Sequence, residues 1–215
     1  MAARKKTLKK TEFESFENCF PKTSQTASTW AAWFQNDHPL HLELGCGKAE
    51  FSYALSSLFP EKNYVGVDLK PDRLWKPAKD ALAEGRKNIA LVCGNLLHLD
   101  QYVAENEADE IWITFPDPFP KKRHIKHRMV NPPFLAQYRK VLAPEGFLHF
   151  KTDNLELFQY TLEVWARQPG LHFHEICFDL HGENALPDHY KLLTTYERAF
   201  LEMGKKINYT CISFS

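Results

Sequence analysis

From Leu40 onward, short apolar segments alternate with amphipathic ones along this sequence of 215 residues. The apolar segments predict strands over residues 40–44, 63–67, 89–93, 110–115 and 147–152, with helices over about 49–58, 71–84, 133–142 and 153–168. This alternation is typical of the α/β class, with a Rossmann-like, doubly wound and mostly parallel sheet. The last predicted strands, 172–178 and 207–214, lack a strong crossover helix between them, so we expect an antiparallel edge hairpin there.

The residues before this alternation differ in composition. The first ten contain five Lys and Arg and no Asp or Glu. They predict a basic, flexible N-terminal arm over residues 1–20, and residues 21–215 are predicted to form a single domain. Ser24 or Thr26 is the predicted N-cap of a helix that carries Trp30, Trp33 and Phe34 at helical spacing.

The composition excludes several classes of protein. No apolar run approaches the roughly 20 residues that a membrane-spanning helix needs, and the charged start has no apolar stretch behind it, as a secretory signal would. The five cysteines are scattered and form no C-x-x-C pair, which argues against a disulfide framework. The ten histidines show no metal-site spacing. We expect a cytoplasmic protein without a metal.

Polar or glycine residues follow five of the predicted strands. They are Glu43 with Gly45 and Gly47, then Asp68, Asn95, Asp117 and Asp153. Ligands of open α/β sheets bind beyond the carboxyl ends of the strands. The recurrence therefore predicts a single pocket at that edge of the sheet.

The first two strand ends indicate the kind of ligand. A dinucleotide fingerprint, G-x-G-x-x-G, would need glycine where Glu50 stands. Glu43 can pair with an ammonium group of a cationic ligand. Asp68 can accept hydrogen bonds from two ribose hydroxyls, as acids at this position do in nucleoside-binding enzymes. Asn95 can read an adenine edge, or it can be a turn residue.

This set of strand ends resembles class I S-adenosylmethionine-dependent methyltransferases. The fourth strand end, Phe115-Pro116-Asp117-Pro118-Phe119-Pro120-Lys121-Lys122-Arg123, resembles the signature of the bacterial tRNA (guanine-N7)-methyltransferase family. Thr152-Asp153-Asn154 and Thr194-Thr195-Tyr196-Glu197 are similar to two further motifs of that family. Three positions depart from the family pattern, namely Ala49 for glycine, Asp68 for glutamate and Phe119 for tryptophan.

The resemblance implies S-adenosylmethionine as cofactor and tRNA as partner, with methyl transfer to N7 of a guanine in the variable loop. It also implies that Lys121, Asp153, Thr194 and Glu197 contact the substrate. Asp117 is the candidate catalytic residue, because it can accept hydrogen bonds from the guanine edge or position the methyl donor. Oligomeric state is not implied.

The sequence is also compatible with two other functions. Asn131-Pro132-Pro133-Phe134 matches the N-P-P-[YF] box of amino-methyltransferases. However, that box lies 16 residues beyond Phe115, and Asn followed by prolines is also a common helix start. A tRNA-binding module without activity is the third possibility, although phosphate binding alone needs no strand-end pocket.

A second basic run follows the predicted catalytic turn. Residues 121–128 contain five Lys and Arg and no acid. Without the ten basic residues of the two runs, 17 Lys and Arg face 27 Asp and Glu in a chain of zero net charge. Lys and Arg contacts to phosphate give affinity for RNA that does not depend on sequence. The candidate RNA-binding residues are Lys122, Arg123, Lys126 and Arg128.

Overall fold

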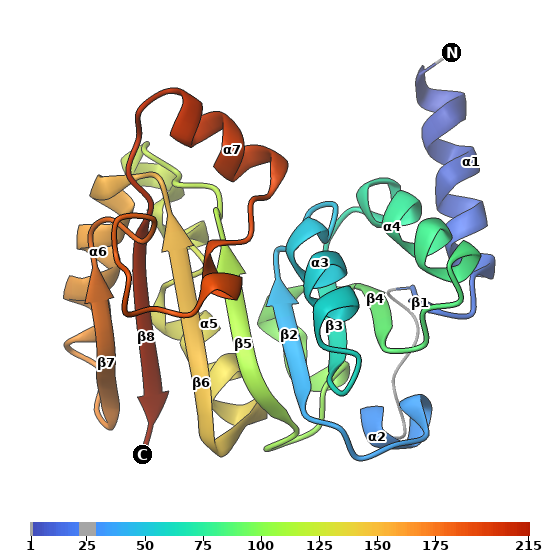
Figure 1. Ribbon diagram of the computed structural model, residues 1–215, viewed down its shortest axis with the longest axis horizontal. Coiled ribbons are helices and arrows are strands. Elements are labelled where there is room, and N and C mark those ends of the chain that lie inside the picture. Colours follow the sequence, from blue (N-terminus) through green and yellow to red (C-terminus); the bar gives the residue numbers. More distant parts are fainter. Residues whose placement is uncertain (1, 22–28) are drawn as a thin grey trace.

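The computed structural model describes residues 2–21 and 29–215, which form one mixed sheet with helices on both faces (Figure 1). The strands are β1 (Cys19–Phe20), β2 (Leu40–Leu44), β3 (Asn63–Asp68), β4 (Ile89–Cys93), β5 (Ala108–Thr114), β6 (Leu142–Thr152), β7 (Leu171–Cys177) and β8 (Asn208–Phe214). In the described part of the chain their order is β1-β4-β3-β2-β5-β6-β8-β7. The helices are α1 (Ala2–Ser15), α2 (Trp30–Phe34), α3 (Glu50–Leu58), α4 (Pro71–Ala83), α5 (Pro132–Val141), α6 (Leu155–Trp165) and α7 (Thr195–Glu202), with 3-10 turns η1 (Leu96–Gln101), η2 (Lys122–His127) and η3 (Asp188–Lys191).

The predicted fold class is confirmed. Strands β1 to β6 pair in parallel, whereas β8 lies between β6 and β7 and is antiparallel to both. The antiparallel edge is therefore present, although a long segment rather than a tight turn joins its two strands. Strand β6 starts at Leu142, earlier than predicted, because Leu142 pairs with Ala108 ahead of an irregularity in the β5–β6 register.

Alternating side chains place two apolar layers on the two faces of the sheet. Ile111 and Ile113 of β5 pack in one cluster with residues of α2, α5 and α6, whereas Trp112 between them packs with α3 on the other face. This strict alternation is what a strand buried on both faces requires.

The N-terminal residues lie against this second face. Helix α1 contacts α4, and Phe13 near its end is fully buried among residues of α4 and β4. Cys19 and Phe20 pair with Leu91 and Val92 of β4. The flexibility of residues 1–20 and the domain boundary stay predictions.

The predicted caps Ser24 and Thr26 lie outside the described residues. Thr29 is the N-cap of α2, and its hydroxyl accepts a hydrogen bond from the Ala32 amide.

The strand order reverses direction around β2, which has β3 on one side and β5 on the other. At such a switch point the connecting helices leave on opposite faces, so a crevice opens at the carboxyl ends of the strands. Helix α7 lies above the ends of β5 and β6 (Figure 1). Within residues 2–21 and 29–215, no helix has the length and apolar character to span a membrane.

Candidate active site

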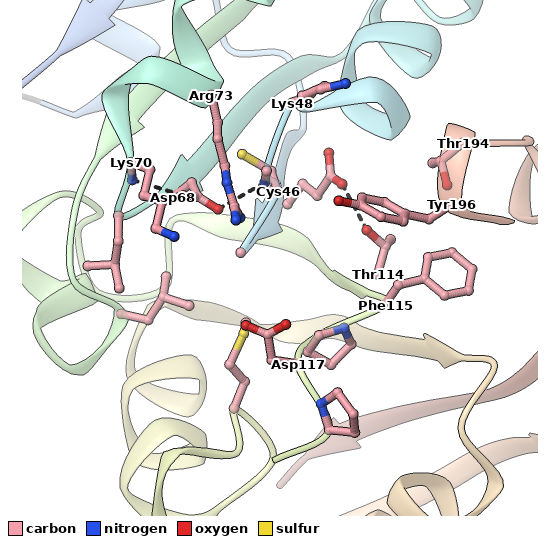
Figure 2. Close-up of a pocket in the computed structure, with 18 of the residues that line it drawn as sticks. Cys46, Lys48, Asp68, Lys70, Arg73, Thr114, Phe115, Asp117, Thr194 and Tyr196 are labelled. Carbon is pink, nitrogen blue, oxygen red and sulfur yellow. Dashed lines mark hydrogen bonds between the residues drawn. The ribbon is translucent and has the colours of Figure 1, made fainter. Parts of the chain in front are cut away.

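A cavity of about 780 Å³ opens at the carboxyl ends of the parallel strands. Residues that follow β2, β3, β4, β5 and β6 line it, together with the start of α7, as Figure 2 shows for part of the lining. Most of the predicted site residues are brought together here, namely Glu43, Gly45, Gly47, Asp68, Asn95, Asp117, Asp153 and Thr194. The prediction of a single pocket at this edge is therefore supported by the geometry.

The glycine loop after β2 is fixed to the end of β3. The amides of Gly45 and Cys46 donate to the Val67 carbonyl at 2.8 and 3.1 Å. Gly45 and Gly47 have φ of 68° and 57°, a region that glycine enters without the strain a side chain meets. A Cβ on Gly45 would also lie 3.0 Å from Sδ of Met129. The loop therefore keeps open the space between β2 and Met129.

Ala49 adopts the same left-handed conformation without being glycine. Its φ is 50°, and it is the N-cap of α3. A non-glycine residue costs roughly 1 kcal/mol in this region. Its methyl group is fully buried beside Gly66, Leu74 and Leu91, and this burial offsets part of the cost.

Glu43 lies at the base of the cavity and is almost fully buried. One carboxylate oxygen accepts from the Ser52 amide and hydroxyl at 2.9 and 2.7 Å, and the other accepts from the Thr114 hydroxyl at 2.9 Å. Burial raises the pKa of this carboxyl, and the hydrogen bonds from Ser52 oppose the rise. Glu43 thus joins β2 to α3 and β5 beneath the ligand space.

Asp68 and Asn95 both organise backbone at the edge of the cavity. The Asp68 carboxylate accepts from the Gly47 amide at 3.0 Å and from the Lys70 amide at 2.9 Å. Asn95 is the N-cap of η1, and its side-chain oxygen accepts from the Leu97 amide at 3.1 Å. Both side chains line the cavity, and each can make further hydrogen bonds, because a carboxylate accepts more than two bonds and a side-chain amide also donates.

The turn after β5 presents Asp117 to the cavity. Phe115 and Phe119, on either side of the Pro-Asp-Pro sequence, have φ of 50° and 43°. Two bulky residues with positive φ are a marked strain, and such strain clusters at functional sites. Asp117 is exposed, and Figure 2 shows it pointing into the space opposite Asp68.

Arg128 is the one candidate RNA contact that is buried. Its side chain is buried, with Nε donating to the Pro118 carbonyl at 2.9 Å and Nη2 to the Phe119 carbonyl at 3.3 Å. Its guanidinium also lies 4.4 Å from the ring centroid of Tyr160. Arg128 therefore holds the strained turn, and its expected contact with RNA stays a prediction.

The other basic residues of this run are exposed, namely Lys121, Lys122, Arg123 and Lys126. They lie on η2 and its N-cap, which follow the Asp117 turn directly. His127 and Phe119 from the same stretch line the cavity. The run is thus flanked by residues that line the cavity, although its exposed Lys and Arg side chains do not line it themselves.

The opposite wall comes from the segment before β8. Thr194 is the N-cap of α7, with its hydroxyl accepting from the Glu197 amide at 3.2 Å. Tyr196 and Phe200 line the cavity with stacked rings, and Tyr196 extends toward the middle of the site (Figure 2). Asp153 lines the same wall and forms an ion pair with Lys205 at 2.6 Å.

Glu197 lies behind this wall rather than on it. It is fully buried, and its two oxygens contact Nζ of Lys151 at 2.7 Å and Nε2 of His181 at 2.9 Å. Lys151 is equally buried and also donates to the Tyr190 carbonyl at 3.1 Å. The expected substrate contact of Glu197 stays a prediction. In the structure Glu197 anchors α7 to β6.

The Asn131-Pro132-Pro133-Phe134 box begins α5. Asn131 occupies the N-cap position, as expected, but its side chain makes no capping bond. Its amide donates to the Ile125 carbonyl at 2.7 Å, and its oxygen accepts from the Tyr160 hydroxyl at 2.7 Å. Asn131 is buried and does not line the cavity, although Phe134 does. The box therefore holds η2 in place.

Sequence reasoning missed several residues that line the cavity. Lys48, Lys70 and Arg73 are exposed cations on its rim (Figure 2). Met129, Tyr196, Phe200 and Lys205 were missed as well. Lys48 and Tyr196 lie inside recognised motifs and could have been found there, whereas Lys205 carries no local signal.

Known proteins are similar to this chain over nearly its whole length. A family model described as "Putative methyltransferase" matches residues 37–210. A tRNA (guanine-N(7)-)-methyltransferase of Cytophaga hutchinsonii is 38% identical over 99% of this chain and 98% of its own length. One of Porphyromonas gingivalis is 44% identical over 85% of this chain and 73% of its own length.

Solved structures agree on the fold. An antibiotic-related methyltransferase has a TM-score of 0.65 at 17% identity, covering 86% of this chain and 92% of its own. A 16S rRNA (adenine(1408)-N(1))-methyltransferase from Catenulisporales acidiphilia, solved with the cosubstrate SAM, has a TM-score of 0.59 at 18% identity, covering 86% of this chain and 89% of its own.

Proposed function

The chain belongs to the tRNA (guanine-N7)-methyltransferase family, and from this membership we propose that it transfers a methyl group from S-adenosylmethionine to N7 of a guanine in tRNA. The observation that carries the proposal is the strained turn that presents Asp117 to the cavity beside the glycine loop. We propose the variable loop as the position of the guanine and the cytoplasm as the location of the enzyme.

The donor side of the cavity fits S-adenosylmethionine. Gly45 and Gly47 leave room for close approach of a ligand to the backbone, and Asp68 offers carboxylate oxygens to ribose hydroxyls. Asn95 stands at the next strand end, where it can bond the adenine edge. Glu43 gives the floor a carboxylate suited to a cationic ligand.

The chemistry needs positioning more than a base. When bound, S-adenosylmethionine supplies an electrophilic methyl group on a sulfonium. Guanine N7 already has an in-plane lone pair, so the N–C bond forms as the S–C bond breaks and no proton has to be removed. The positive charge passes to the guanine ring. Asp117 can hold the base in line and stabilise that charge.

The acceptor side fits a nucleic acid. Tyr196 and Phe200 offer aromatic surface for a base, and the exposed basic residues after Asp117 offer cations to phosphates. Lys121, Asp153 and Thr194 are proposed substrate contacts. The amino-methyltransferase alternative loses support because Asn131 lies outside the cavity with both polar groups occupied.

The primary test is nucleoside analysis of tRNA incubated with enzyme and labelled donor. We expect 7-methylguanosine as the product, and mapping of the label will give the modified position. Asp117→Asn should lower kcat/KM by about 100-fold or more, as loss of a charge-stabilising group does. Because Asp117 is exposed, unfolding should not change. Asp188→Asn, a fully exposed acid outside the cavity, is the matched control.

Wild-type enzyme that binds the donor but methylates no guanine N7 would overturn the proposal. An active Asp117→Asn variant would leave the reaction standing but remove Asp117 from it.

The docking surface has its own test. Changing Lys122, Arg123 and Lys126 together to Gln should weaken tRNA binding and lower its salt slope by about 0.7–0.9 for each phosphate that the removed cations had neutralised. Donor affinity should not change. Gln at three exposed lysines away from the cavity, Lys76, Lys87 and Lys206, is the control. Equal slopes for both triple variants would mean that this surface does not dock RNA.

A further inference from the structure

An ion pair lies inside the acceptor side of the cavity. Asp153 follows β6, Lys205 follows α7, and their Oδ2 and Nζ atoms are 2.6 Å apart. Both residues line the cavity, and Nζ of Lys205 also lies 4.7 Å from the ring centroid of Phe200. A negative group, a positive group and an aromatic face therefore stand together next to the Asp117 turn, since β5 and β6 are neighbouring strands.

This pair is open to solvent on its Lys205 side only. The Lys205 side chain is 46% exposed, whereas the Asp153 side chain is 14% exposed. The next residue, Lys206, pairs with Asp179 at 3.0 Å, is 71% exposed and does not line the cavity. Lys205 and Lys206 thus each form an ion pair with an Asp, and of these two pairs only Asp153–Lys205 lines the cavity. Lys205 can turn toward a ligand from its exposed side, and the N–H groups of a bound base can then replace it as donors to the Asp153 carboxylate.

We propose that Asp153 and Lys205 together read the Watson–Crick edge of the target guanine, with Lys205 donating to O6 and Asp153 accepting from the N1–H and N2–H groups. This inference rests on the proposed function and adds Lys205 as a specificity-determining residue. The match is chemical: the edge of guanine presents one acceptor beside two donors, and the pair presents one donor beside one acceptor group. Adenine carries an amino donor where guanine has O6, so it would face the ammonium with a donor.

The charge of the pair also suits the reaction. Methylation at N7 leaves a positive ring, which an isolated ammonium next to O6 would oppose. Asp153 neutralises Lys205, so the pair can recognise the edge without destabilising the product. Asp117 remains the group that compensates the new charge.

The experiment crosses two enzyme variants with two base analogues placed at the mapped position in tRNA. 6-Thioguanine weakens the acceptor at position 6 and keeps both donors, whereas inosine keeps O6 and loses the 2-amino group. Wild-type kcat/KM should fall about 10- to 100-fold on each analogue. Lys205→Met should have a lower kcat/KM on guanine than wild type, but its kcat/KM should not fall further when 6-thioguanine replaces guanine. When inosine replaces guanine, its kcat/KM should fall by the same factor as that of wild type.

Asp153→Asn should give the opposite pattern. Its kcat/KM should fall less than that of wild type when inosine replaces guanine, and by the same factor as wild type when 6-thioguanine does. Lys206→Met is the matched control and should behave as wild type on all three bases. If Lys205→Met caused a fold defect or a general loss of affinity, its kcat/KM would fall by the same factor on all three bases. That result would overturn the assignment. Failure of the proposed function would be distinct, because wild-type enzyme would then methylate none of the three bases.

Discussion

One face of the sheet is covered in two different ways. Over β2, β3 and β4, helices α3 and α4 pack on it with apolar side chains such as Phe51, Leu55 and Leu74. Over β5, β6 and β8, the cover is the segment 178–194, which has only the short turn η3 within it. The first half holds the proposed donor site, and the second holds the proposed acceptor site.

The difference explains why the acceptor half contains a fully buried ion pair. A helix satisfies its own backbone groups, but an irregular segment brings unpaired carbonyls into the core, and they need donors. Lys151 supplies them, since its Nζ donates to the carbonyls of Tyr190 and Leu192 at 3.1 and 3.5 Å. Glu197 then balances the charge of Lys151. The acceptor half thus uses a buried ion pair where the donor half uses apolar packing.

The two halves are joined across the mouth of the cavity. Both carboxylate oxygens of Glu50, at the start of α3, accept from the amide and hydroxyl of Thr195, at the start of α7. The position that excluded a dinucleotide fingerprint therefore ties the donor half to the acceptor half.

The largest effect should come from breaking the buried pair. Lys151→Met leaves the Glu197 carboxylate and two carbonyls without their donor, and we expect a loss of about 3–5 kcal/mol of unfolding free energy in urea titration. Lys151→Met combined with Glu197→Leu should recover part of this loss, because no uncompensated charge stays buried. A single variant as stable as wild type would show that the irregular cover does not depend on Lys151.

The next effect concerns pH. His149 of β6 is stacked on Trp112 at 4.1 Å, and its Nδ1 is 2.8 Å from the Tyr209 hydroxyl. Burial lowers the pKa of His149 to about 4, although Glu110 opposes this. Burial alone would raise the pKa of Glu110, but the hydrogen bond and charge of His41 hold it at about 2. The other groups that act on the pKa of His149 are His41, His189 and Lys62, and all three lower it.

The sign follows from which state binds the proton. The unfolded chain protonates His149 near pH 6.5 and the folded chain only near pH 4. Stability from a neutral His149 is therefore complete above pH 6.5 and falls by about 3 kcal/mol as the pH drops to 4. His149→Phe keeps the stacked ring and should flatten the pH dependence of urea unfolding across this window. Parallel curves for both proteins would contradict the assignment to His149.

A smaller effect is expected in the glycine loop of the donor half. Gly47 has φ of 57°, and a Cβ there would contact nothing within 4 Å. Gly47→Ala should therefore cost only the conformational strain, about 1–2 kcal/mol in thermal unfolding. Donor affinity, measured by calorimetry, should fall as well, while tRNA affinity stays the same. A fall in tRNA affinity alone would reverse the assignment of the two halves.

The smallest effect should be at Ala49. Ala49→Gly removes the left-handed strain of about 1 kcal/mol but also removes a buried methyl worth about 0.8 kcal/mol. The two contributions nearly cancel, so the melting temperature should shift by little. A large stabilisation would mean that the methyl group is poorly packed against Gly66.

How much could be predicted depends on how far apart the interacting residues are in sequence. The donor half is built from a strand, its loop and the next strand end, and Glu43, Gly45, Gly47 and Asp68 were all identified there. Thr194 was identified only through the family resemblance, since its spacing from Glu197 is by itself a capping pattern. Lys151 and Lys205 were missed, because their partners are 46 and 52 residues away.

The sequence by itself determined the alternation of strands and helices from Leu40 to Trp165, the class of sheet and the strand ends that meet at one edge, whereas α1, β1 and α7 were not predicted. Periodicity is local, and parallel strands place their carboxyl ends together whatever covers them. Only the tertiary structure decided which charges face solvent. Lys126 and Arg128 are two residues apart in the same basic run, yet one is exposed and the other is buried against the Pro118 and Phe119 carbonyls. The physical reason is that burial of a charge depends on which distant backbone needs a donor, and no local pattern records that need.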